Sequence, residues 1–288
     1  MLVEKSNHKI IGEPELDANL YIPETNEKLP AVLMCHGFLS AKEELGDIPE
    51  QIAKQGYIVL TFDFSGHGKS QGDRGYIKSD THLDDAERAL KFLLSQPKVK
   101  DDIFAVVGHS LGTVATARLI TESEIGKKCK SCVLLSPVRK MEDSISKFEL
   151  AAYQFVSNLA WPLLLITGKH IYLPYKYSAK DIYMSKDAIK KATDLKFLQN
   201  KMSVNNYTYM ISQIDNEKSA RKITVPTLVA VANGDKLVPN SGSKIIFEAI
   251  KAEPKKYVEI TNSGHSMMMD NSSDKVSDEI INWLKQTI

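Results

Sequence analysis

The feature that most constrains the fold of this chain is an alternation of short apolar runs with amphipathic segments. The apolar runs are rich in β-branched and aromatic residues, as buried strands are, and they cover residues 31–35, 57–62, 103–107, 132–135, 227–232 and 257–260. The amphipathic segments predict helices at residues 47–55, 81–95, 111–122, 242–251 and 274–286. Strands that are apolar on both faces belong in a parallel sheet that helices cover on both sides. The sequence therefore predicts an α/β fold with a mostly parallel central sheet.

This alternation is interrupted between residues 137 and 222, a stretch that is mostly helical in character and too long for a plain loop. We expect residues 1–136 and 223–288 to form one α/β core. Residues 137–222 are expected to form a mainly helical cap inserted between two strands of that core. The first thirty residues predict an antiparallel ribbon that leads into the sheet.

Composition and charge exclude several classes of function. The 288 residues include 37 basic and 36 acidic side chains, so there is no electrostatic case for binding nucleic acid. The first residues are polar and charged where a signal peptide needs an apolar segment. The apolar run at Leu159–Ile166 is too short to cross a bilayer, so we expect no stable membrane span, only transient contact of an apolar cap face with lipid. Three cysteines, an odd number, favour a reducing cytoplasm.

Two short motifs resemble metal or nucleotide sites but lack essential residues. Cys129 and Cys132 have zinc-knuckle spacing, yet the chain has only one other cysteine to complete a four-cysteine site. The glycine-rich loop at 63–75 resembles two phosphate-binding fingerprints. However, Asp63 and Gln71 occupy positions where those fingerprints need glycine. We therefore expect no metal and no cofactor.

Polar or glycine-rich residues follow five of the predicted strands. The carboxyl ends of parallel strands meet at one edge of a sheet, and ligands of open α/β sheets bind there. The residues in question are His36–Ser40, Asp63–Ser70, Ser110, Asp235 and His265. We expect them to converge on a single site.

Ser110 lies between two glycines, at residues 108 and 112, where a predicted strand becomes a helix. We expect these glycines to let the backbone bend and the helix pack closely. A serine hydroxyl is a weak nucleophile until a base takes its proton, and His265 is the one histidine downstream of both Ser110 and Asp235. Asp235 can hold the imidazole tautomer and stabilise the imidazolium. Each motif alone is common in turns, but their order and placement favour a catalytic triad.

These residues also carry a resemblance to a known family. The stretch Gly108–Gly112 matches the G-x-S-x-G elbow of the α/β-hydrolase fold, and the order Ser, Asp, His matches its triad. The chain resembles in particular the serine esterases grouped with monoacylglycerol lipases, lysophospholipases and cinnamoyl esterases, through the segments His36–Phe38, Phe62–Ser70, Asn233–Asp235 and Gly264–His265. The resemblance implies an oxyanion hole built from the backbone N–H groups of Phe38 and Leu111, and it implies no cofactor.

Serine at the elbow indicates acyl transfer and argues against the dehalogenases and epoxide hydrolases of this fold, which use aspartate there. The resemblance implies a carboxylic ester hydrolase that acts on a monoacylglycerol or another short- or medium-chain ester. Feruloyl or cinnamoyl esters and acyl thioesters are alternatives, and a non-catalytic ligand receptor is an alternative of another class. We expect a small-molecule ester as the partner, and the sequence predicts no oligomeric state.

Candidate substrate-binding residues flank the serine or lie in the cap, and they are His36, His109, Tyr153, Trp161, Tyr207 and Met267. The aromatic and aliphatic side chains of the cap suit an acyl chain or an aromatic ring. For most of them, packing within the cap is the competing explanation. His36 has a further interpretation, as a residue that orients the loop after the first core strand.

Overall fold

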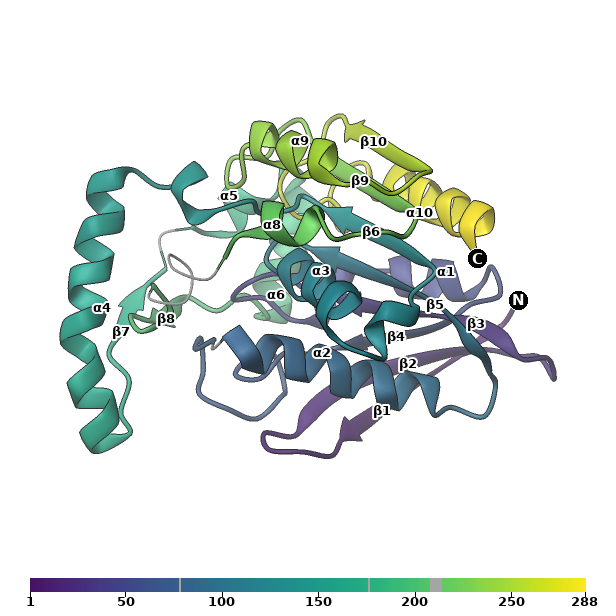
Figure 1. The fold of residues 1–288 in the computed structure, drawn as a ribbon, viewed down its shortest axis with the longest axis horizontal. Coiled ribbons are helices and arrows are strands. Elements are labelled where there is room, and N and C mark those ends of the chain that lie inside the picture. The colour runs from purple at the N-terminus through teal and green to yellow at the C-terminus, as the bar shows by residue number, and fades with distance from the viewer. Residues whose placement is uncertain (78, 176, 208–213) are drawn as a thin grey trace.

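The centre of the protein is an eight-stranded sheet, seen in a computed structural model that describes residues 1–77, 79–175, 177–207 and 214–288 (Figure 1). Across the sheet the strands are β1 (Val3–Ile10), β2 (Leu16–Pro23), β4 (Ile58–Phe62), β3 (Leu29–Cys35), β5 (Val99–His109), β6 (Ser131–Leu135), β9 (Thr227–Ala232) and β10 (Lys255–Ile260). The β1–β2 and β2–β4 pairs are antiparallel and the other pairs are parallel. The predicted sheet and the leading ribbon are confirmed.

Helices cover both faces of this sheet, as expected. One face carries α1 (Ile48–Ala53) and α10 (Ser273–Thr287), and the other carries α2 (Ser79–Leu94), α3 (Gly112–Glu122) and α9 (Asn240–Ala249). Successive side chains of a strand point to opposite faces. On β5, Val106 accordingly packs in the α2–α3 cluster and Val107 in the α1–α10 cluster. A strand buried on both faces is apolar at successive positions, so its sequence is a continuous apolar run.

The chain between β6 and β9 is mostly helical. It contains α4 (Lys147–Thr167), β7 (Tyr172–Pro174), α5 (Ala179–Ile182), α6 (Lys186–Leu195), β8 (Lys201–Ser203) and α8 (Asn216–Ala220). The antiparallel β7–β8 pair was not predicted, because three-residue strands are too short to show a period of two. Short 3₁₀ turns complete the structure at Lys42–Leu45, Gly126–Lys128 and Met141–Asp143. The division of the chain into core and cap stays a prediction.

The helix α4 extends along one side of the molecule, clear of the sheet and its covering helices (Figure 1). It begins at a capping box between Ser146 and Glu149 and ends at Gly168, whose φ is 66°. In the described part of the chain, α4 is the one helix that is long and apolar enough to cross a membrane. The apolar run Leu159–Ile166 alone did not indicate a helix of this length, because polar residues interrupt the apolar pattern in the rest of the helix. One such helix is weak evidence for a span.

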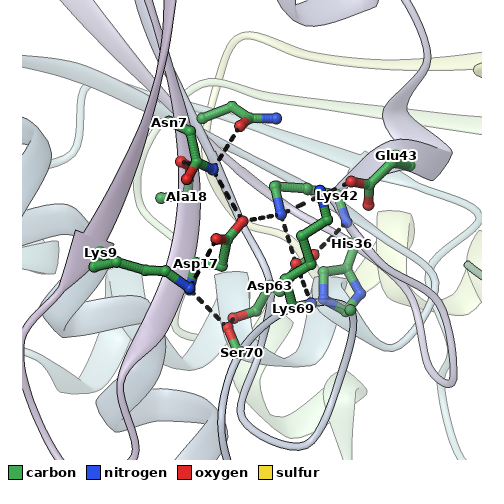
Figure 2. A network of polar contacts seen from close by, with 12 residues as sticks. Asn7, Lys9, Asp17, Ala18, His36, Lys42, Glu43, Asp63, Lys69 and Ser70 are labelled. Atoms are coloured by element: carbon green, nitrogen blue, oxygen red, sulfur yellow. Dashed lines mark hydrogen bonds and ion pairs between the residues drawn. The ribbon is translucent and has the colours of Figure 1, made fainter.

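A buried ion network joins β2 to the loops that follow β3 and β4 (Figure 2). The Lys42 ammonium contacts the Asp17 carboxylate and lies 2.6 Å from Asp63 Oδ2, and all three side chains are at most 3% exposed. Asp63 also accepts hydrogen bonds from the backbone N–H groups of Lys42, at 2.7 Å, and Lys69, at 2.8 Å. Charges out of water are tolerated when they are paired and hydrogen-bonded. The network therefore fixes the loop after β3 against the loop after β4.

Replacing Lys42 tests this network. Lys42→Met leaves the buried Asp63 carboxylate without its cation and Asp17 with the half-exposed Lys9 alone, so we expect the free energy of unfolding to fall by about 3–5 kcal/mol. Lys9→Met is the matched control, because Lys9 lies 3.1 Å from the same Asp17 but is 49% exposed, and its loss should cost less than about 1 kcal/mol. Urea unfolding followed by circular dichroism measures both. Equal losses for the two variants would contradict the network's structural role.

Candidate active site

Ser110 connects β5 to α3 in a left-handed backbone conformation. Its φ is 51°, which is uncommon for a residue with a side chain and costs on the order of 1–3 kcal/mol. The Ser110 N–H donates to the Leu135 carbonyl of β6 at 2.9 Å. This backbone bend turns the serine out of the sheet at its carboxyl edge, where its hydroxyl meets other groups.

The two flanking glycines serve close packing. A Cβ atom on Gly108 would lie 2.7 Å from the Gly112 carbonyl oxygen, and one on Gly112 would lie 2.7 Å from the Cys35 carbonyl oxygen. Neither glycine has a positive φ. The sequence interpretation assigned the bend to the glycines, whereas the strained conformation belongs to Ser110 and the glycines make room for it.

Ser110, His265 and Asp235 form one hydrogen-bonded chain. His265 Nε2 lies 2.8 Å from Ser110 Oγ, and His265 Nδ1 lies 2.7 Å from Asp235 Oδ2. The three residues follow β5, β10 and β9, so the convergence predicted at the carboxyl edge of the sheet is present. Ser110 retains only 8% of its exposure and His265 only 4%. The chain of contacts is therefore largely shielded from water.

The charge of Asp235 is well supported. Burial raises the pKa of Asp235, but the neighbouring His265 and two backbone N–H donors outweigh burial and lower this pKa below its ordinary value. The donors are Leu237, at 2.8 Å, and Val238, at 2.9 Å, and both reach Oδ1. An ionised Asp235 favours a proton on His265 Nδ1, which leaves Nε2 free to accept the proton of the Ser110 hydroxyl.

Two other residues that might have completed this chain lie elsewhere. His170 contacts Ser203 Oγ at 2.8 Å in the segment between β6 and β9. Asp270 accepts hydrogen bonds from the N–H groups of Met184, at 2.8 Å, and Gly264, at 2.7 Å. Asp270 therefore fastens the loop that carries His265 to the chain before α6, a role that no sequence motif indicated.

Two cavities meet at Ser110. The larger, of about 110 Å³, is lined by apolar side chains and by the tyrosines Tyr153, Tyr175, Tyr177 and Tyr207, and no charged residue is among its described lining residues. The smaller, of about 50 Å³, has a polar wall that includes Glu44, His109, Gln199, His265 and Ser266. The site thus presents an uncharged side and a polar side to any group bound at the serine.

The predicted substrate-binding residues fall into two groups. Tyr153 and Tyr207 line the larger cavity, with their rings stacked 4.1 Å apart, and His109 lines the smaller one. His36, Trp161 and Met267 line neither of these cavities. Their role as substrate contacts stays a prediction.

These three residues lie in different surroundings, which explains why they line neither cavity. Met267 is fully buried in the core cluster between the sheet and α10, because the chain turns inward directly after His265. The His36 ring lies 2.7 Å from the Gly37 carbonyl and accepts from Phe64 N–H at 3.0 Å, so it ties two loops together. Trp161 lies on α4.

Phe38, on the loop after β3, and Leu111, at the start of α3, both line the larger cavity together with Ser110. The close approach of Gly112 to the Cys35 carbonyl holds these two segments together. Backbone N–H groups at a helix start favour negative charge. The assignment of Phe38 and Leu111 to an oxyanion hole stays a prediction.

In the described chain, no group of three or more histidine, cysteine, aspartate or glutamate side chains has the arrangement of a metal site. The cysteines are all buried and unpaired, and burial raises the pKa of Cys35 and of Cys129 to about 12. These thiols are consequently poor ligands and poor nucleophiles.

Comparison with known proteins decides the family. Residues 26–272 match the family model described as serine aminopeptidase, S33. The chain belongs to this family. The chain is 25% identical to human monoglyceride lipase over 260 residues, which are 88% of the chain and 82% of that protein. It is 24% identical to a polyketide transferase of Stachybotrys chlorohalonatus over 245 residues, covering 82% of the chain and 81% of the relative.

Solved structures show the same fold. A complex of DcsB with its substrate analogue superposes with a TM-score of 0.83 at 18% identity, covering 99% of both chains. A monoacylglycerol lipase of Paleococcus ferrophilus gives a TM-score of 0.70 at 22% identity, covering 99% of this chain and 98% of that one. The chain therefore has the α/β-hydrolase fold, and its expected resemblance to the monoacylglycerol lipase group is confirmed.

The site also contains a buried acid–histidine pair that no sequence motif indicated. Glu44 Oε1 lies 2.9 Å from His109 Nδ1 and also accepts a hydrogen bond from the N–H of Gly37, next to Phe38. His109 Nε2 lies 3.1 Å from the carbonyl oxygen of His265. Both partners of the His109 ring are acceptors, so the ring must carry two protons to satisfy them. This geometry favours the doubly protonated form of His109.

The electrostatics of the pair agree with this geometry. Burial raises the pKa of Glu44, but the charge and hydrogen bond of His109 lower it to about 2. Burial lowers the pKa of His109, but Glu44 outweighs burial and raises it above its ordinary value. The pair links the loop after β3 to the backbone of His265. Nothing in the sequence around Glu44, within Lys-Glu-Glu-Leu, distinguishes it from a surface carboxylate.

Glu44→Gln tests the pair through its pH dependence. The lowered pKa means that ionised Glu44 stabilises the fold above about pH 4.5, and that this stabilisation is lost as pH falls toward about 2. At pH 7 we expect Glu44→Gln to cost about 3–5 kcal/mol, with the deficit shrinking below pH 4.5. Urea unfolding at pH 7, 4 and 3 measures it, with partly exposed Glu43→Gln as control. A deficit that stays constant with pH would refute the ion pair.

Proposed function

We propose that this protein hydrolyses carboxylic esters through an acyl-enzyme on Ser110. The observation that carries the proposal is the chain of two short hydrogen bonds from Ser110 through His265 to Asp235. That chain supplies a base for the serine and an anion for the base, which is the requirement for activating a hydroxyl nucleophile.

In the proposed reaction, Ser110 Oγ attacks the ester carbonyl carbon while His265 Nε2 takes the hydroxyl proton. The carbonyl oxygen becomes an oxyanion beside the N–H groups of Phe38 and Leu111. The tetrahedral intermediate collapses, and His265 returns the proton to the departing alcohol. Water then attacks the acyl-enzyme, again through His265, and releases the carboxylic acid and free Ser110. Asp235 stays ionised and stabilises the imidazolium of His265 throughout.

The substrate we propose is an ester with an uncharged, apolar acyl group, such as a monoacylglycerol or another short- or medium-chain ester. Support comes from the larger cavity, which presents apolar and tyrosine side chains and no charge among its described lining residues. The polar smaller cavity on the other side of Ser110 suits the hydroxyl groups of an alcohol such as glycerol. Similarity to human monoglyceride lipase agrees with this assignment.

We further propose that residues 137–222 act as a cap over the site. In support, Tyr153, Tyr175 and Tyr207 from this segment face Ser110 and Leu111 from the core across one cavity. A cytoplasmic location also stays a prediction from the cysteine content.

A second candidate is an ester of a hydroxycinnamic acid. Four tyrosines line the larger cavity, and flat aromatic rings pack well against aromatic side chains. A panel of p-nitrophenyl esters of graded chain length, with monoacylglycerols, feruloyl esters, acyl-CoA and peptides, separates these substrates. Highest kcat/KM on feruloyl esters would select the second candidate, and turnover of acyl-CoA or peptides alone would overturn ester hydrolysis.

Removal of the nucleophile or the base tests the mechanism. We expect Ser110→Ala and His265→Ala each to lower kcat by roughly 10⁴- to 10⁶-fold, and the double variant to be no worse, because the residues act as a unit. His8→Ala, on β1, is the control and should keep full activity. A fluorophosphonate probe should label the native protein but not Ser110→Ala. A bound ester analogue without labelling or turnover would instead identify a receptor.

Filling the larger cavity tests which side of Ser110 holds the acyl group. Val138 lines that cavity, so Val138→Phe should lower kcat/KM for octanoyl esters by about 10- to 200-fold while acetyl esters lose little. Ile245→Phe makes a similar change on α9, where Ile245 is 38% exposed, and serves as the control. An equal loss for acetyl and octanoyl esters would contradict this assignment.

A further inference from the structure

The helix α4 exposes an unusually apolar surface. Seven large apolar side chains of this one helix are exposed, namely Phe148, Phe155, Val156, Leu159, Leu163, Leu165 and Ile166. Four of them, Phe148, Phe155, Leu159 and Ile166, expose on the order of 500 Å² per copy, so two copies that pack through them bury about 1,000 Å², near the lower limit of a specific interface. A patch of that size on one helix marks an interaction surface.

Four of these side chains form a straight stripe. Phe148, Phe155, Leu159 and Ile166 follow one another at spacings of seven, four and seven residues, which an α-helix of 3.6 residues per turn brings to one line. Their exposed fractions are 84%, 65%, 64% and 83%. The opposite side of α4 faces the protein body, since Ser157 and Ala160 are the buried residues of the helix. The stripe therefore lies on the side of α4 that faces away from the protein body.

The pattern of the stripe is symmetrical about Ser157. Phe148 and Ile166 lie nine residues on either side of it, and Phe155 and Leu159 lie two residues on either side. Beside the stripe, small Ala151 and Ala152 in the first half mirror bulkier Leu163 and Pro162 in the second half. Two such helices packed antiparallel therefore place these small side chains against the bulky ones beside the stripe, whereas parallel helices would place each half against its own copy.

We propose that α4 docks antiparallel onto α4 of a second copy of this chain, about a two-fold axis that passes on the stripe side of the helix at the level of residue 157. A two-fold pairing brings the same patch of both copies together, so each residue meets its mirror position. Phe148 then packs on Ile166 of the other copy, and Phe155 packs on Leu159. The hydrogen-bonded pair Gln154–Asn158, at 2.8 Å, lies beside the stripe as part of a polar rim.

A lipid surface fits the same helix less well. Helices that lie in a membrane interface carry lysine and arginine along their polar face, but α4 has no charged residue from Leu150 to Gly168. The size complementarity of the two halves also has no counterpart in lipid. Docking of two copies is independent of the proposed hydrolysis, because the stripe lies on the side of α4 away from the cavity at Ser110.

Mass and mutation test the pairing. Light scattering coupled to size-exclusion chromatography of the full chain should give twice 32.2 kDa at tens of micromolar. Phe155→Asp/Leu159→Asp should restore the single-chain mass while the far-ultraviolet circular dichroism spectrum stays that of the native fold. Leu195→Asp, at a position 51% exposed on α6, is the matched control and should remain paired. A single-chain mass for the native protein at all concentrations, or a paired mass for the stripe variant, would overturn the proposal.

Cysteine cross-linking tests the direction of the pairing. Residues 148 and 166 are 18 positions apart, or about 27 Å along the helix, so antiparallel helices bring position 148 only to position 166. We expect a mixture of Phe148→Cys and Ile166→Cys proteins to form a disulfide-linked dimer on mild oxidation, and each protein alone to stay unlinked. The native cysteines are buried and do not interfere. Linking of Phe148→Cys alone would contradict the antiparallel arrangement.

Vesicles distinguish the lipid alternative. Phosphatidylcholine vesicles should not co-sediment the native protein at concentrations where it is paired. Co-sedimentation that the stripe variant abolishes, together with a single-chain mass in solution, would assign the stripe to a lipid surface and refute the pairing of copies.

Discussion

The contact between the start of α3 and the end of β3 is the constraint on which the rest of the site depends. Gly112 packs so closely on the Cys35 and His36 carbonyls that a Cβ atom would lie 2.7 Å from the first oxygen and closer still to the second. The chain leaves β5 through the left-handed conformation of Ser110 and enters α3 at this contact. The same contact brings Leu111 to Phe38. Backbone packing thus places the nucleophile and both proposed oxyanion donors before any side chain contributes.

Two buried ion pairs in one short turn then hold the loop after β3 in place. Lys42 joins this loop to Asp17 and Asp63, and Glu44 joins it to Gly37 and His109. Buried pairs contribute little net stability compared with apolar packing, but they tolerate only one geometry. The site therefore gains a defined loop position where apolar contacts alone would allow several. Glu44 extends this control to His265, whose carbonyl accepts from His109.

The sequence predicts the sheet well because β5 and its neighbours are buried on both faces and therefore apolar at successive positions. It also predicts which of several acids and histidines meet, since Ser110, Asp235 and His265 each follow a strand and parallel strands end at one edge. It fails where position depends on three-dimensional packing. Met267 turns into the core directly after His265, and Glu44 becomes buried through contacts with residues far away in the sequence. Neither outcome leaves a local pattern.

The two sides of α4 connect the proposed pairing to the site. On the inner side, Tyr153 stacks on Tyr207 and lines the cavity at Ser110, whereas on the outer side Phe155 is 65% exposed. A rigid helix that is held from outside also holds its inner side chains, because both project from one backbone. An occupant of the outer stripe would therefore limit how far Tyr153 moves away from Ser110. The width of the larger cavity then depends on what covers α4 as well as on the residues that line it.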